Sequence, residues 1–128
     1  LARRLVARGW LVEFVGIPAE QQMLSAAYPG YSVHAFNDLK GLVDFLRTCS
    51  VVISNDSGGG HLGSLLGLRT FTITRRRSDF TWRPGFNELN SVINPVLSFK
   101  WLGKTVWRPF IPLRRIVQAL PSWKGKQA

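Results

Sequence analysis

Short apolar runs alternate with longer amphipathic stretches along most of this chain. The short runs predict β-strands over residues 10–15, 32–36, 51–53, 70–73 and 92–93. Stretches with apolar residues at helical spacing predict helices over residues 1–8, 18–27, 39–46, 62–68 and 112–120. This alternation predicts an α/β fold with a three-layer, Rossmann-like, mainly parallel sheet. Such sheets bind ligands at the carboxyl ends of their strands.

Residues 1–128 are expected to form a single domain, because this length is enough to bury one core. A helix at the amino terminus with no strand before it suggests a piece of a larger protein that lacks its first strand. The longest apolar runs are far too short to span a bilayer.

The junction after the strand at 51–53 has the strongest chemical signal. The strand ends in Asn55-Asp56-Ser57, and Gly58, Gly59 and Gly60 follow, with His61 next. A side-chain oxygen of Asp56 or Ser57 can cap the following helix, while the glycines have no Cβ to keep a ligand from the first amides. Free amides and the positive end of the helix dipole favour a phosphate. The alternative is a glycine-rich strand–helix turn that binds nothing.

Two further residues qualify as ligand contacts. Glu20 lies just past the end of the strand at 10–15, where a carboxylate in a nucleotide-binding sheet accepts hydrogen bonds from a ribose diol. A first-turn glutamate that complements the helix dipole explains it equally well. His61 lies in the first helical turn, where the dipole favours a neutral ring that donates one hydrogen bond. No metal site is expected, because His34 is the only other histidine and no Cys/His cluster exists.

The charge is distributed unevenly. The formal net charge is +10, but residues 1–68 hold five basic and five acidic side chains. Residues 69–128 hold twelve basic side chains against two acidic ones. The second half is therefore expected to attract an anionic partner: a nucleotide, a phosphorylated glycan, an acidic membrane surface or nucleic acid.

Two basic segments have several interpretations. The first is the run of Arg75, Arg76 and Arg77. It is either part of a solvated loop, or one of its arginines contacts the bound anion. Residues 96–128 form a basic and aromatic carboxyl-terminal segment that ends with a helix. One interpretation of its tract at 99–110 is that the aromatic residues stack on nucleic-acid bases. The interpretation that we favour is that the tract covers the sheet, packs on a missing domain or lies at a membrane interface.

The residues around the glycine turn resemble a known family. The run from Ser54 to Leu62, preceded by Gly-Ile-Pro-Ala-Glu at 16–20 and followed by Trp-Arg-Pro at 82–84, is similar to the carboxyl-terminal domain of bacterial lipopolysaccharide heptosyltransferases, glycosyltransferase family 9. The likeness covers residues 1 to about 95. Gly59 and Gly60 replace the usual proline and methionine, and Thr-Arg-Arg at 74–76 replaces the usual Gly-Pro-Thr.

This resemblance implies the donor-binding half of a GT-B enzyme that transfers a sugar, usually heptose from ADP-heptose, to the lipopolysaccharide core. Glu20 would hold the ribose, and Asp56, Ser57, Gly58 and His61 would line the diphosphate and the transferred sugar. Such enzymes are inverting and need no metal or other cofactor. Their acceptor-activating base lies in the amino-terminal domain, so this chain alone is expected to be inactive. The implied location is cytoplasmic, peripheral at the inner face of the inner membrane.

Two other functions stay open. One is a nucleotide-binding module without transferase activity, which the altered loop at 74–76 would suit. The other is a basic nucleic-acid-binding domain that uses the cationic second half.

Overall fold

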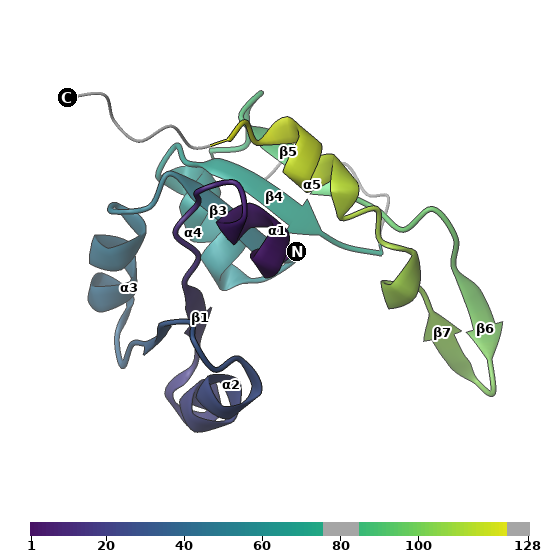
Figure 1. Cartoon of the computed structure of the whole chain (residues 1–128), viewed down its shortest axis with the longest axis horizontal. Coiled ribbons are helices and arrows are strands. Elements are labelled where there is room, and N and C mark those ends of the chain that lie inside the picture. The colour runs from purple at the N-terminus through teal and green to yellow at the C-terminus, as the bar shows by residue number, and fades with distance from the viewer. Residues whose placement is uncertain (76–84, 123–128) are drawn as a thin grey trace. The chain divides into compact units, whose positions relative to one another are not determined.

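The structure is a computed structural model that describes residues 1–75 and 85–122. It is a mixed α/β structure with small, mainly parallel sheets (Figure 1). The chain divides into two compact units. The first holds residues 1–45 and the carboxyl-terminal residues from 117 onward, and the second holds residues 46–116. The predicted α/β class is thereby confirmed in this coarse form.

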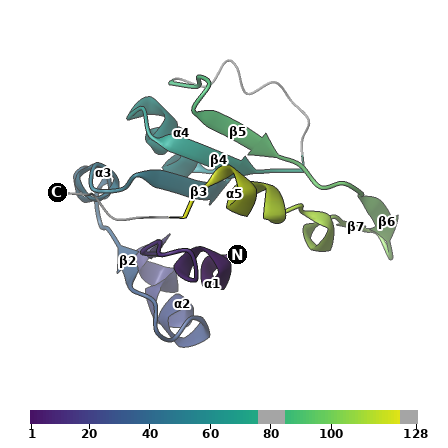
Figure 2. The same ribbon diagram turned by 45° about the horizontal axis from the view of Figure 1, so that its top comes forward.

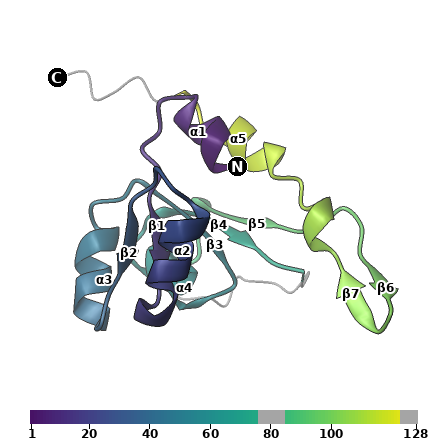
Figure 3. The same cartoon turned by 60° about the horizontal axis from the view of Figure 1, so that its bottom comes forward.

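The first unit is built on a parallel strand pair with a helical crossover. Strands β1 (Phe14–Gly16) and β2 (Val33–Ala35) pair with Phe14 opposite Val33. A 3₁₀ helix (Pro18–Glu20) and α2 (Gln21–Ala27) connect them and lie beside the pair (Figure 3). Helix α3 (Leu39–Leu46) follows β2. Asp38 caps this helix, because its Oδ1 accepts a hydrogen bond from the Gly41 amide at 2.7 Å.

The two ends of the chain meet in this first unit. The amino-terminal helix α1 spans Ala2–Val6, and α5 spans Arg114–Ala119. Arg8 Nη1 donates hydrogen bonds to the carbonyl oxygens of Val117 at 2.7 Å and Leu120 at 2.9 Å. Because carbonyl groups at a helix end have no partner within the helix, the guanidinium satisfies them and complements the dipole.

The second unit contains a parallel three-stranded sheet. Strands β3 (Val51–Asn55), β4 (Arg69–Ile73) and β5 (Asn90–Ile93) lie in the order β3-β4-β5. Helix α4 (Gly58–Leu65) connects β3 to β4 and covers one face of these strands (Figure 2). Phe71, Thr70 and Thr72 of the central strand are almost completely buried. Residues of a central parallel strand are buried on both faces, which explains this burial.

A two-stranded hairpin lies apart from this sheet in sequence and in pairing. Strands β6 (Phe99–Trp101) and β7 (Lys104–Val106) pair in antiparallel fashion. A 3₁₀ helix (Arg108–Phe110) follows, and the Phe110 ring lies 5.9 Å from the Phe99 ring. The carboxyl-terminal segment predicted at 96–128 thus contains a hairpin before its helix.

Several predicted boundaries are wrong. The strand predicted at 10–15 is regular only over Phe14–Gly16, because β2 offers three residues for pairing. Trp10 donates its indole N–H to the Pro121 carbonyl oxygen instead, at 2.9 Å. The helix predicted at 62–68 starts four residues earlier, at Gly58, and ends at Leu65. Arg76, Arg77 and the Trp-Arg-Pro segment at 82–84 lie outside the described residues.

Candidate functional site

The junction of β3 and α4 lies at the carboxyl edge of the parallel sheet. Asn55 ends β3 opposite Ile73 of β4, and Ile73 lies opposite Ile93 of β5. Ser57 takes the cap position with extended dihedral angles, φ −145° and ψ 168°. Its hydroxyl forms no capping hydrogen bond with any described residue, so the predicted side-chain cap is wrong for Ser57. The Ser57 hydroxyl therefore does not cover the first-turn amides of α4.

The three glycines of this turn have different surroundings. A Cβ atom on Gly60 would overlap the Ser54 hydroxyl, and one on Gly63 would lie 3.0 Å from Val52 Cγ2. These two glycines allow α4 to approach β3 closely. A Cβ on Gly58 or Gly59 would meet no atom of the described residues within 4 Å, and neither glycine has a positive φ. Packing against Ser54 therefore accounts for Gly60, whereas neither packing against the described residues nor backbone conformation accounts for Gly58 and Gly59.

A buried hydrogen bond joins the carboxyl-terminal end of α4 to the start of β5. Ser64 Oγ donates to Asn90 Oδ1 at 2.6 Å, and both residues are buried. The Asn90 amide also donates to Asn87 Oδ1 at 3.2 Å. Buried polar groups that satisfy one another in this way hold a helix in one position. These bonds therefore hold the carboxyl-terminal end of α4, the end opposite the glycine turn.

Asp56 and His61 face each other across the first turn of α4. His61 Nε2 lies 3.4 Å from Asp56 Oδ1, and each side chain is about one third exposed. The imidazole is thus positioned by a carboxylate while part of both groups stays accessible to a ligand. Asp56, Ser57, the three glycines and His61, all predicted from the sequence, lie together on this one junction.

The neighbouring strand adds a cation to the same edge. Thr74 follows β4, its amide donates to the Ile93 carbonyl oxygen at 3.1 Å, and its own carbonyl oxygen accepts from the Asn94 amide at 3.0 Å. These bonds fix the chain where it leaves the sheet. Arg75 comes next and is exposed. Because β4 runs parallel to β3, Arg75 leaves the sheet at the edge where α4 begins.

Glu20 belongs to the first unit and lies beside a hollow there. Its Oε2 is 3.6 Å from the position that a Cβ would take on Gly16, at the end of β1. Gly16, Phe36, Asn37 and Leu42 are among the residues that line a hollow of about 270 Å³. It opens where the parallel strands β1 and β2 end, which is where such sheets bind ligands. The Glu20 carboxylate thus lies next to a mainly apolar recess.

The residues of this hollow were missed by the sequence interpretation. The sequence around Phe36, Asn37 and Leu42 contains no recognisable motif. One signal could have found them: Phe36 ends the predicted strand at 32–36 and Asn37 follows it, and the carboxyl ends of strands form binding edges.

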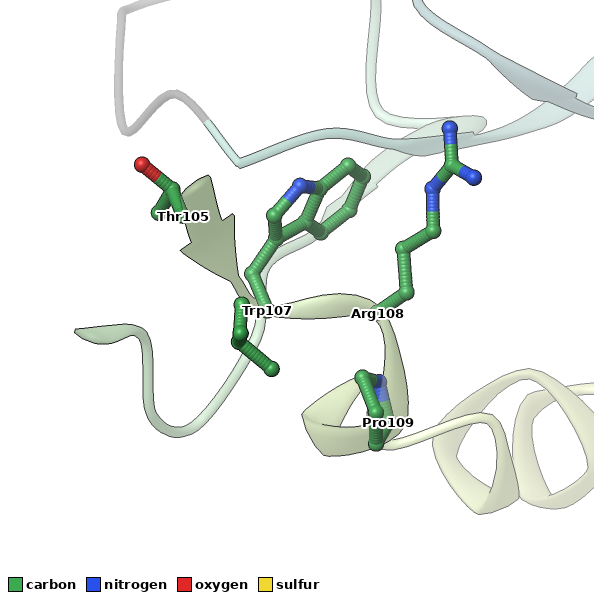
Figure 4. Close-up of a pocket in the computed structure, with 5 residues that line it drawn as sticks. Thr105, Trp107, Arg108 and Pro109 are labelled. Atoms are coloured by element: carbon green, nitrogen blue, oxygen red, sulfur yellow. The ribbon is translucent and has the colours of Figure 1, made fainter. Parts of the chain in front are cut away.

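A larger hollow of about 380 Å³ lies elsewhere. Thr105, Val106, Trp107, Arg108 and Pro109 line it (Figure 4). None of the predicted site residues lines it, and Arg108 is the only charged residue among the five that do. We therefore place the candidate ligand chemistry at the strand ends and not in this hollow.

No metal centre is found among the residues that the structure describes. No group of three or more His, Cys, Asp or Glu side chains comes together in residues 1–75 and 85–122. His34 Nε2 instead lies 2.8 Å from Glu13 Oε1, and its ring lies 4.5 Å from the Phe45 ring. Within the same described ranges no helix has the length and apolar character needed to cross a membrane.

Comparisons of the chain with protein-family models, with curated proteins and with solved structures found no significant match. The likeness to heptosyltransferases therefore stays a prediction from the sequence.

Proposed function

We propose that this chain is the donor-binding half of an inverting glycosyltransferase of GT-B architecture, with a Rossmann-like, three-layer arrangement. It would transfer a sugar, in our proposal heptose from ADP-heptose, to the lipopolysaccharide core. The observation that carries the proposal is the first turn of α4. This turn lies at the carboxyl edge of a parallel sheet, the Ser57 hydroxyl does not cap it, and no atom of the described residues lies within 4 Å of a Cβ placed on Gly58 or Gly59.

The chemistry of transfer fits such a turn. In an inverting transfer the acceptor hydroxyl attacks the anomeric carbon as the bond to the diphosphate breaks. Negative charge then builds up on the departing diphosphate. Open amides and the positive end of the α4 dipole stabilise that charge. His61, oriented by Asp56, would donate a further hydrogen bond, and Arg75 would supply a positive charge at the same edge.

The nucleoside part has separate support in the first unit. Glu20 presents a carboxylate that accepts hydrogen bonds from ribose hydroxyls, and the adjacent hollow is lined by Phe36 and Leu42, which suit a planar base. By the family resemblance, Glu20 would hold the ribose of the nucleotide-sugar. The acceptor-activating base would come from a further, amino-terminal domain, and the complete enzyme would act at the inner face of the inner membrane.

Calorimetric titration with ADP, UDP, GDP and pyrophosphate tests the donor site. The expected result is that ADP binds best and that Gly58→Glu weakens ADP and pyrophosphate by at least about tenfold, which is about 1.4 kcal/mol. Glutamate in the first turn stabilises a helix, so loss of folding cannot explain this loss of affinity. Leu65→Gln, an exposed position at the other end of α4, is the matched control.

Absence of binding by every nucleotide to the folded chain would contradict the proposal. ADP binding without sugar transfer, when the proposed amino-terminal domain is supplied, would instead favour the nucleotide-binding module without transferase activity.

A further inference from the structure

The hairpin of β6 and β7 exposes large apolar side chains at its end. Leu102, in the turn, is 89% exposed, and the neighbouring Trp101 is 64% exposed. The hairpin forms its own sheet and extends beyond β5 (Figure 2). Phe99 and Trp101 share one face because side chains alternate along a strand. Phe99 is anchored next to Phe110, so Trp101 continues this apolar face outward.

The backbone conformation at position 102 does not explain why the residue there is a leucine. Leu102 has φ 47° and Gly103 has φ 76°, as in a two-residue turn with both central residues in the left-handed region. Asn, Asp and Gly suit the first of these positions, whereas a leucine there is disfavoured by about 1–2 kcal/mol. Its side chain is almost fully exposed, so contacts within the described residues do not offset this cost.

Cations surround this apolar end. Lys100 and Lys104 flank Trp101 and Leu102 on the two strands, and both are exposed. At the base of the hairpin the Arg108 guanidinium lies 5.8 Å from the Trp107 ring, and both side chains border the hollow of Figure 4. After Glu88 the sequence contains seven basic residues and no acidic one. The surface is therefore complementary to an anionic partner.

We propose that this hairpin docks on the surface of an anionic lipid bilayer. Trp101 and Leu102 enter the boundary between headgroups and acyl chains, where tryptophan is favoured and leucine gains hydrophobic burial. Lys100, Lys104 and Arg108 then face the lipid phosphates. A nucleic acid would match the cations and the tryptophan, but an aliphatic side chain at the outermost position offers it neither a stacking surface nor a hydrogen bond. The proposal does not depend on the donor site.

Flotation with two kinds of vesicle tests this surface, using the whole 128-residue chain. One kind is pure phosphatidylcholine and the other an equimolar mixture of phosphatidylcholine and phosphatidylglycerol. We expect binding to the anionic vesicles that weakens with salt, and much less to the neutral ones. Leu102→Asn should lower the anionic-vesicle affinity by about tenfold. Lys100→Gln and Lys104→Gln should each lower it on the order of fivefold.

Asparagine suits the left-handed conformation at position 102, so Leu102→Asn should keep or improve the hairpin. Leu11→Asn, at a leucine that is 86% exposed in the first unit, is the matched control and should bind as the unaltered chain does. Lys40→Gln, on α3, is the control for charge.

Three results would overturn the proposal. One is the absence of anionic-vesicle binding by the folded chain, and another is equal binding by Leu102→Asn and the unaltered chain. The third is loss of single-stranded oligonucleotide binding in the hairpin variants while vesicle binding stays unchanged, which would assign the hairpin to nucleic acid. ADP titration of Leu102→Asn should match that of the unaltered chain, so failure of this proposal is distinguishable from failure of the donor site.

Discussion

Gly60, in the first turn of α4, lies directly over the hydroxyl group of Ser54 near the end of β3. A Cβ on Gly60 would overlap Ser54 Oγ and would stand 3.3 Å from Ser54 Cβ. Ser54 Oγ is itself buried and has no hydrogen-bond partner among the described residues. The closeness of helix and strand here thus depends on the absence of a side chain at one position and leaves a hydroxyl unsatisfied at the other.

Gly60→Ala should therefore destabilise the chain by about 1–3 kcal/mol, as overpacking of a close contact does. Ser54→Ala should be nearly neutral or stabilising, because it removes a buried hydroxyl without a partner. The double variant should recover part of the loss, since the hydroxyl that meets the new methyl group is gone. Urea denaturation measures all three, and strict additivity of the two changes would contradict the contact.

Gly58→Ala and Gly59→Ala should have the opposite effect on stability. No described atom lies near either Cβ position, so each alanine should stabilise α4 by up to about 1 kcal/mol through its higher helix propensity. If the amides bind a diphosphate, the double variant should also lose ADP affinity. Thermal unfolding and calorimetry on the same samples check both results. Higher stability with unchanged ADP binding would mean that the turn is only structural.

If Asp56 orients the His61 ring toward the diphosphate, changes at either residue should weaken ligand binding. His61→Ala should weaken pyrophosphate and ADP on the order of tenfold, because a hydrogen bond to a charged group is lost. Asp56→Ala should also weaken both ligands, since the imidazole loses the carboxylate 3.4 Å away. Asp56→Asn should restore most of the affinity, because the amide oxygen still accepts from the ring. Equal losses in the alanine and asparagine variants would rule out a positioning role.

Both side chains are about one third exposed, so none of these changes should alter the free energy of unfolding by more than about 1 kcal/mol. Circular dichroism during urea denaturation provides this control.

Glu20→Ala should show whether this carboxylate binds the nucleoside or the diphosphate part of ADP. Removing the carboxylate should weaken ADP by about tenfold while leaving pyrophosphate binding unchanged, because pyrophosphate has no ribose. Glu88→Ala, a glutamate in the other unit, serves as the charge-matched control. If Glu20→Ala weakened pyrophosphate as much as ADP, the carboxylate would not be acting on the ribose.

Within the second unit, the sequence predicted the parallel sheet better than the hairpin. Alternating apolar runs and glycine breaks gave β3, β4 and the existence of α4, because strand and helix periods are local properties of the chain. The hairpin was missed because its turn is Leu102-Gly103 and lacks the usual Asn-Gly or Asp-Gly signal. The mixture of cations and aromatic residues also hid the alternation of its two short strands.

The sequence by itself determined the α/β class, the junction at Asn55–His61 and the excess of positive charge in the second half. These follow from residue type and spacing along the chain. Only the tertiary structure decided that Gly60 is required by the close approach to Ser54, whereas a Cβ on Gly58 or Gly59 would meet no atom of the described residues. It also decided that Glu20 lies beside a hollow with Phe36 and Leu42. It likewise limited β1 to three residues by the length of its partner. Such features depend on which atoms of distant residues meet, and this is set by packing between elements and not by any pattern within one of them.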